Sequence, residues 1–186
     1  RHPVRACASA WRFGLSCSRV LACLSAAARA TGLGLRLTRP GAIAVREVAP
    51  RILYRALIPD MIVWSPAERA WASAEIVAEA CELDAKQVQC ARELYLATPE
   101  TTWRLLERCN AALQHIMICG HNPGLSQIAS RFGPKPQTRE LATAGIASAV
   151  WLNAQWQTLQ PETAHACDLD DPESMADRWA SATLPL

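Results

Sequence analysis

The sequence contains no apolar run of the ~18 to 20 residues that a transmembrane helix needs, because arginine or another polar residue interrupts every apolar stretch. This absence argues against a membrane-spanning protein, and we expect no membrane partner. With 186 residues, of which 51% are hydrophobic, the chain is long enough for one domain with a sizeable core.

Acidic residues are absent from residues 1–46, which carry eight arginines and therefore a charge of +8, whereas the remainder carries −6. Globular domains usually mix their charges, so we treat residues 1–36 as an atypical N-terminal segment and predict one domain over 37–186. An organelle-targeting presequence, a trimmed chain and an out-of-frame stretch all fit this composition. Composition leaves these three origins open.

Lysine is nearly absent, and most excess basic charge lies in the atypical segment, so we expect no nucleic-acid partner. None of the eight cysteines forms a C-x-x-C pair, and none of the four histidines has the spacing of a zinc site. We therefore expect reduced thiols, a cytoplasmic protein and no structural metal.

From Leu37 onward, short apolar runs alternate with longer amphipathic segments, which is typical of a sheet flanked by helices. We predict strands over 59–64, 116–119 and 145–152. We predict helices over 65–83, from Thr98 onward and over 124–132. The fold class is therefore α/β with a mostly parallel sheet between helices.

Local signals predict where these helices begin. Ser65, followed by Pro66 and Glu68, forms the pattern of a capping box, and Thr98 before Pro99 is a second cap. After Gln160 the sequence becomes polar, with acidic residues at 168, 170 and 171, so we predict a loop and a loose terminus there.

One candidate site lies at Gly120-His121-Asn122-Pro123-Gly124, between a predicted strand and a predicted helix. Ligands of open α/β sheets bind beyond the carboxyl ends of strands, where helix N-termini attract anions. Arg69 occupies the same kind of position after another strand, and a guanidinium matches phosphate oxygens. The alternatives are that His121 only stabilises its turn and that Arg69 forms a surface ion pair with Glu68 or Glu75.

The sequence resembles the histidine phosphatase superfamily (phosphoglycerate-mutase-like), and in particular its SixA-type phosphohistidine phosphatase branch. The resemblance covers about three quarters of the chain in the right order. It rests on the segments 37–41 (LTRPG), 65–80 (SPAERAWASAEIVAEA), 93–100 (ELYLATPE), 119–125 (CGHNPGL) and 141–145 (LATAG). It implies the three-layer α/β/α sandwich of that superfamily.

The resemblance also implies a mechanism. A histidine of an Arg-His motif attacks phosphorus and carries the phosphoryl group until water removes it, with no metal or organic cofactor. Arg1-His2 is the only Arg-His pair in the chain, so His2 would be the nucleophile and Arg1 would bind substrate. His121 would be the second histidine of the pocket, while Arg69 and Asn122 would contact the phosphoryl group.

Glu93 aligns with the acidic residue that donates a proton in other branches of the superfamily, although a solvated carboxylate is an equally good interpretation. The family places Arg-His at the end of the first core strand, and here no residues precede Arg1 to form one, while Pro3 replaces a glycine or alanine.

Two functions follow from the resemblance. The first is a monomeric phosphatase that acts on a phosphohistidine protein or a small phosphorylated metabolite. The second is a degenerate member of the family that binds phosphate and acts as a regulatory module.

Overall fold

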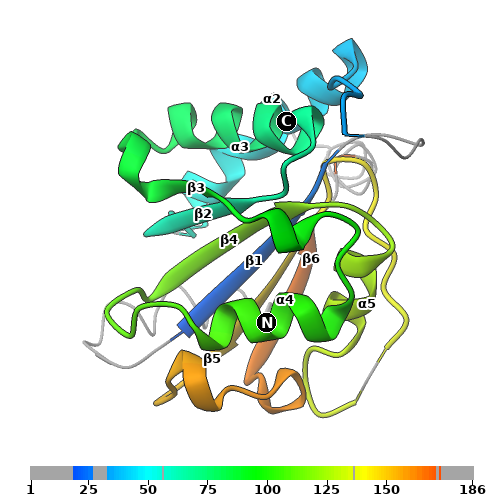
Figure 1. Cartoon of the computed structure of the whole chain (residues 1–186). Coiled ribbons are helices and arrows are strands. Elements are labelled where there is room, and N and C mark those ends of the chain that lie inside the picture. The colour runs from blue at the N-terminus through cyan, green and yellow to red at the C-terminus, as the bar shows by residue number, and fades with distance from the viewer. Residues whose placement is uncertain (1–18, 27–32, 56, 136, 171, 173–186) are drawn as a thin grey trace, which may run out of the picture.

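The computed structural model describes residues 19–26, 33–55, 57–135, 137–170 and 172. These residues form one six-stranded sheet with helices on both faces (Figure 1). The strands are β1 (Arg19–Ser25), β2 (Met61–Trp64), β3 (Val88–Cys90), β4 (His115–Gly120), β5 (Ile146–Trp151) and β6 (Ala166–Asp170). The α-helices are α2 (Arg39–Tyr54), α3 (Glu68–Ala80), α4 (Pro99–Glu107) and α5 (Gly124–Ser130). Short 3₁₀ helices are η1 (Ala85–Gln87), η2 (Arg92–Leu94), η3 (Trp156–Thr158) and η4 (Pro161–Thr163).

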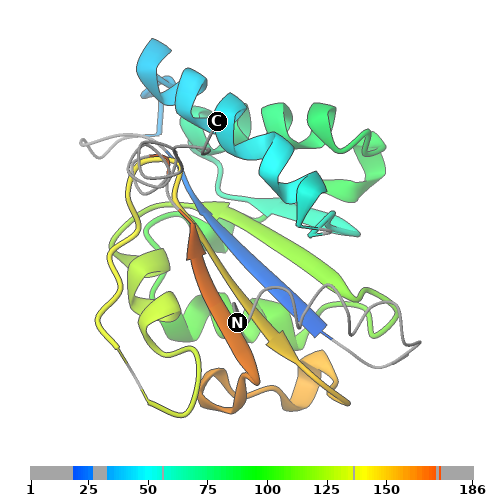
Figure 2. The same cartoon turned by 180° about the vertical axis from the view of Figure 1, so that it is seen from behind.

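The strand order is β3-β2-β4-β1-β5-β6. The pairings β3/β2, β2/β4 and β4/β1 are parallel, whereas β1/β5 and β5/β6 are antiparallel. Helices α2 and α3 cover one face of the sheet, and α4 and α5 cover the other (Figures 1 and 2). The predicted α/β class, with a mostly parallel sheet between two helical layers, is therefore confirmed.

Alternation along the strands divides the core between the two faces. In β1, Leu21 and Cys23 pack in the cluster that contains residues of α4 and α5. Val20, Ala22 and Leu24 pack in the cluster that contains residues of α2 and α3. Every residue of β1 is buried, as expected for a strand covered on both faces.

Strand β1 lies between β4 and β5, so residues 19–25 contribute to the middle of the sheet. These residues lie in the atypical segment 1–36, where the sequence pattern predicts no strand. The division of the chain at residue 36 stays a prediction.

The start of one helix was predicted correctly and that of another was not. Thr98 caps α4 by accepting a hydrogen bond from the Thr101 backbone N–H, which confirms that prediction. The capping box at Ser65 was wrong, because α3 begins at Glu68 after Ala67 and has no side-chain cap. The Ser65 hydroxyl is engaged in the site described below.

The prediction of a loop after Gln160 was also wrong for residues 166–170, which form edge strand β6. Arg51 of α2 and Arg55, which caps the C-terminus of that helix, neutralise its carboxylates. Arg51 contacts Asp170 at 3.0 Å, and Arg55 contacts both Asp170, at 3.1 Å, and Asp168. Charge on an edge strand thus has partners on a neighbouring helix, which a count of acidic residues does not reveal.

We expect Asp170→Asn to lower the free energy of unfolding by about 1 to 3 kcal/mol, because it removes the negative charge that two half-buried guanidinium groups share. Urea unfolding measures the change. Lys86→Ala is the matched control, because it removes an exposed ion pair with Asp84 and should change stability by less than about 0.5 kcal/mol. Equal effects of the two substitutions would contradict a stabilising role for the α2–β6 ion pairs.

Candidate functional site

The carboxyl ends of β1, β2 and β4 meet at one edge of the sheet. Ser65 directly follows β2, and its backbone N–H donates to the Cys119 carbonyl of β4 at 3.0 Å. Ala26 directly follows β1, and its N–H donates to the Gly120 carbonyl at 2.8 Å. His121 directly follows β4 and therefore lies beside both Ser65 and Ala26.

The imidazole of His121 is buried, with 8% of the residue exposed. Its Nε2 lies 2.8 Å from the hydroxyl oxygen of Ser65, which is itself fully buried. The ring of Tyr95 meets the imidazole edge-on, with 6.0 Å between ring centroids. Among the described residues, Nδ1 of His121 is buried and has no hydrogen-bond partner.

Arg69 lies in the first turn of α3 and is 2% exposed. Burial, the larger cause, and the positive charge of Arg69 together lower the pKa of His121 from 6.5 to about 4. The two residues therefore lie close enough to interact electrostatically. At neutral pH the site pairs a cationic guanidinium with a neutral imidazole.

Neither a protein-family model nor a curated protein sequence matches the chain, but solved structures do. A protein assigned as phosphohistidine phosphatase SixA from Nakamurella multipartitia superposes with a TM-score of 0.67 at 19% identity, over 83% of this chain and 96% of that one. The protein histidine phosphatase SixA complexed with tungstate gives 0.67 at 18% identity, over 85% and 99%. The chain has the SixA fold.

A more distant match extends this likeness to other phosphatases. A mycobacterial glucosyl-3-phosphoglycerate phosphatase superposes with a TM-score of 0.56 at 13% identity, over 83% of this chain and 98% of that one. The resemblance to phosphoglycerate-mutase-like phosphatases is thus confirmed for the fold. At these identities the likeness does not establish the reaction.

Two of the predicted site residues, Arg1 and His2, lie outside the described residues. Within the described part of the SixA fold, the central strand β1 ends at Ser25, and Ala26 follows it beside Gly120. Neither residue carries an imidazole. The nucleophilic role of His2 stays a prediction.

Asn122 is exposed, and its side chain holds the turn after β4 in place. Its Nδ2 donates to the Leu141 carbonyl at 2.6 Å, and its Oδ1 accepts from the hydroxyl of Ser126 at 2.7 Å. These contacts use both ends of the amide for loop structure. They provide no support for substrate binding, which stays a prediction.

Glu93 is exposed, and its carboxylate forms an ion pair with Arg108. It lines a surface hollow with Thr101, Arg104, Glu107 and Arg108, and His121 is not among the residues lining that hollow. The structure thus brings His121 and Arg69 together and gives Glu93 a different partner. Nothing in this geometry favours Glu93 as the proton donor.

Sequence reasoning missed Ser65 and Tyr95 as neighbours of His121. The signal for Ser65 was its position, because it follows β2 as directly as His121 follows the adjacent strand β4. The capping pattern suggested a different use for its hydroxyl. No comparable signal marked Tyr95, which reaches the imidazole from the loop after η2.

Close packing fixes the helix that follows His121. A Cβ atom on Gly124 would lie 2.3 Å from the carbonyl oxygen of Ala97, a residue between η2 and α4. Only glycine therefore allows α5 to begin so near that segment. The same contact region encloses a small cavity lined by Leu94, Thr102 and His121, together with Ala97, Ile118, Gly120, Gly124 and Leu125.

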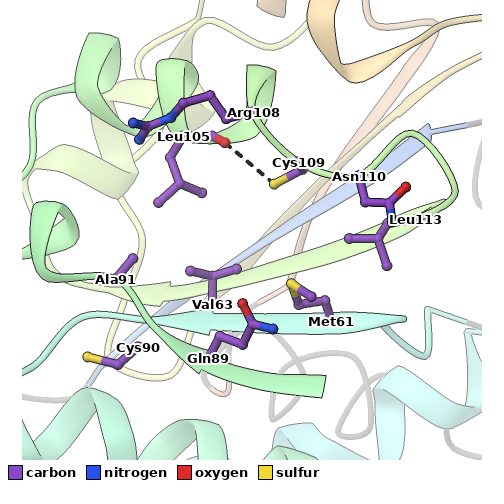
Figure 3. Close-up of a pocket in the computed structure, with 10 residues that line it drawn as sticks. All are labelled: Met61, Val63, Gln89, Cys90, Ala91, Leu105, Arg108, Cys109, Asn110 and Leu113. Atoms are coloured by element: carbon purple, nitrogen blue, oxygen red, sulfur yellow. Dashed lines mark hydrogen bonds between the residues drawn. The ribbon is translucent and has the colours of Figure 1, made fainter. Parts of the chain in front are cut away.

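A second, larger cavity of about 360 Å³ lies at the other end of α4 (Figure 3). Residues of β2, β3 and the C-terminal end of α4, together with the segment that follows α4, line it. They are Met61, Val63, Gln89, Cys90, Ala91, Leu105, Arg108, Cys109, Asn110 and Leu113. Cys109 there donates its thiol to the Leu105 carbonyl at 3.4 Å. His121 and Arg69 do not line this cavity, so it is separate from the candidate site.

Among the described residues, no group of three or more His, Cys, Asp or Glu side chains is placed to hold a metal ion. Similarly, none of the described helices combines the length and apolar character of a membrane span.

Removing the Arg69 charge tests the electrostatic coupling within the site. We expect the pKa of His121 to be about 4 in the wild type and to rise in Arg69→Met, while remaining below 6.5 because burial is the larger cause. A ¹H–¹⁵N NMR titration of the histidines measures both values. His115 is an internal control, because burial lowers its pKa without a contribution from Arg69. An unchanged His121 pKa in the variant would contradict the coupling.

Proposed function

We propose that the chain is a SixA-type phosphatase that hydrolyses phosphohistidine in a protein, or a small phosphorylated metabolite. The observation that carries the proposal is the buried pair of Arg69 and neutral His121 at the carboxyl edge of a SixA-fold sheet. We further propose that the protein acts as a monomer in the cytoplasm.

The chemistry of the two side chains fits a tetrahedral oxyanion. A guanidinium offers planar N–H donors and a positive charge, both of which match phosphoryl oxygens. A neutral imidazole with Nδ1 protonated adds one further donor. The related SixA was solved with tungstate, a tetrahedral oxyanion of phosphate-like shape, and this supports the same ligand class here.

The nucleophile in this proposal is His2, with Arg1 beside it. A ring nitrogen of His2 forms a bond to phosphorus as the phosphorus–nitrogen bond of the substrate breaks, and the departing imidazole takes up a proton. Water then attacks phosphorus, which breaks the bond to His2 and releases inorganic phosphate. Imidazole is a good leaving group, so this substrate class places little demand on a general acid such as Glu93.

A second candidate function is phosphate binding without turnover. It is favoured by the end of β1, where Ser25 and Ala26 occupy the strand end that carries Arg-His in the family that the sequence resembles. In that case Arg69 and His121 would hold a phosphorylated group that no residue attacks. Phosphoryl transfer distinguishes the two functions.

We expect the wild type to release phosphate from a histidine-phosphorylated protein and to trap ³²P on His2. His2→Ala should abolish trapping, and Arg69→Met should lower kcat/KM by about 100-fold or more, because it removes charge stabilisation of the transferring group. Acid-labile labelling followed by peptide mapping measures the trapped group. Phosphate release that is unchanged in His2→Ala would contradict the role of that residue.

The phosphate-binding alternative leads to a separate prediction, which concerns the end of β1. If the wild type binds tungstate but releases no phosphate, we expect Ser25→Arg with Ala26→His to create measurable turnover, because Ala26 lies beside His121. Calorimetry with tungstate and a phosphate-release assay give the two readouts. The control is the wild-type protein, assayed in parallel under the same conditions. Absence of both binding and turnover in the wild type would contradict both candidate functions.

A further inference from the structure

The position of one proton is determined by the surroundings of Ser65. This residue is fully buried, and among the described residues its hydroxyl has one hydrogen-bond partner, Nε2 of His121 at 2.8 Å. The backbone N–H of Ser65 is already used, since it donates to the Cys119 carbonyl. The hydroxyl can therefore either donate to Nε2 or accept from it.

The two arrangements leave different numbers of buried polar groups unpaired. If Nε2 carries the proton and donates to Ser65, the hydroxyl proton has no acceptor and Nδ1 becomes a lone pair without a donor. If the hydroxyl donates to Nε2, the proton of the neutral ring sits on Nδ1, and only that N–H lacks a partner. Since each unpaired buried group is costly, the second arrangement is favoured.

We propose that Ser65 is a positioning residue that holds His121 in the tautomer with its proton on Nδ1, so that a donor and not a lone pair faces the bound oxyanion. The tautomer itself follows from the Ser65 contact, and only the nature of the ligand rests on the proposed function. Phosphoryl oxygens accept hydrogen bonds, so a lone pair at Nδ1 would repel them.

The charge of Arg69 makes this tautomer useful. Its guanidinium and the buried surroundings both oppose protonation of His121, so the ring cannot offer a donor on both nitrogens near neutral pH. A single proton must then be placed on the nitrogen that meets the ligand. The Ser65 hydroxyl does this by occupying the other nitrogen.

The first test is the ¹⁵N NMR spectrum of the histidine side chains in the unliganded full chain near pH 7. We expect Nδ1 of His121 to resonate as a protonated nitrogen and Nε2 as an unprotonated one. The chain has four histidines, and His121→Gln assigns the signals. The reverse pattern in the wild type would overturn the proposal, whatever the enzymatic activity.

The second test is the effect of Ser65 on that pattern. We expect Ser65→Ala to shift His121 toward the Nε2-protonated tautomer and Ser65→Thr, which keeps a hydroxyl, to restore the wild-type pattern. Ser148→Ala is the matched control, because it removes another buried serine hydroxyl, in β5. If Ser65→Ala does not fold, Ser65→Cys replaces it, since a thiol is a weak donor. A tautomer unchanged in these hydroxyl-deleted variants would overturn the proposal.

Tungstate binding separates this inference from the proposed function. We expect tungstate to move the Nδ1 resonance of His121, and Ser65→Ala to weaken tungstate binding by about tenfold. An Nδ1-protonated His121 that depends on Ser65 but does not respond to tungstate would support the positioning role and contradict the oxyanion site.

Discussion

The parallel pairing of β2 with β4 and of β4 with β1 determines where the candidate functional groups lie. Parallel strands end at the same edge, so the residues that follow β1, β2 and β4 are neighbours although they are far apart in sequence. Ala26, Ser65 and His121 are brought together in this way. A shift of one residue in the β2/β4 pairing would separate Ser65 from His121, and a shift in the β4/β1 pairing would separate Ala26 from Gly120. Either shift would also turn core side chains to the opposite face.

Burial then determines the chemical state of the site. Because the folded protein lowers the pKa of His121 from 6.5 to about 4, the ring is neutral wherever the sheet and helices are intact at neutral pH. The stability that depends on this neutral state is present above about pH 6.5 and is lost as the pH falls through 4. The pocket thus offers permanent positive charge from Arg69 and one neutral hydrogen-bond donor from His121.

The sequence predicts the parts of the fold that depend on local signals. The strand 116–119 and the helix after Thr98 are recognisable because an apolar run and a side-chain cap act within a few residues. Edge strand β6 could not be predicted in the same way. Its acidic residues are compensated by Arg51 of α2 and by Arg55 directly after that helix, both more than 100 positions earlier in the chain. Strand β1 lies in a segment whose composition suggested a separate origin.

In the candidate site too, residues with local sequence signals could be predicted, and residues whose partners come from the tertiary structure could not. Arg69 and His121 could be found from their positions at helix starts, because each signal is local. The role of Ser65 could not, since a serine before a helix has the same local pattern whether it caps that helix or contacts an imidazole that follows the adjacent strand. Glu93 and Asn122 have partners that only the tertiary structure supplies.

We propose that Arg69 and His121 bind one tetrahedral oxyanion between them. A crystal structure of the protein with tungstate would test this proposal. We expect tungstate oxygens within hydrogen-bond distance of both the Arg69 guanidinium and Nδ1 of His121. Tungstate bound elsewhere, or in contact with neither side chain, would contradict it.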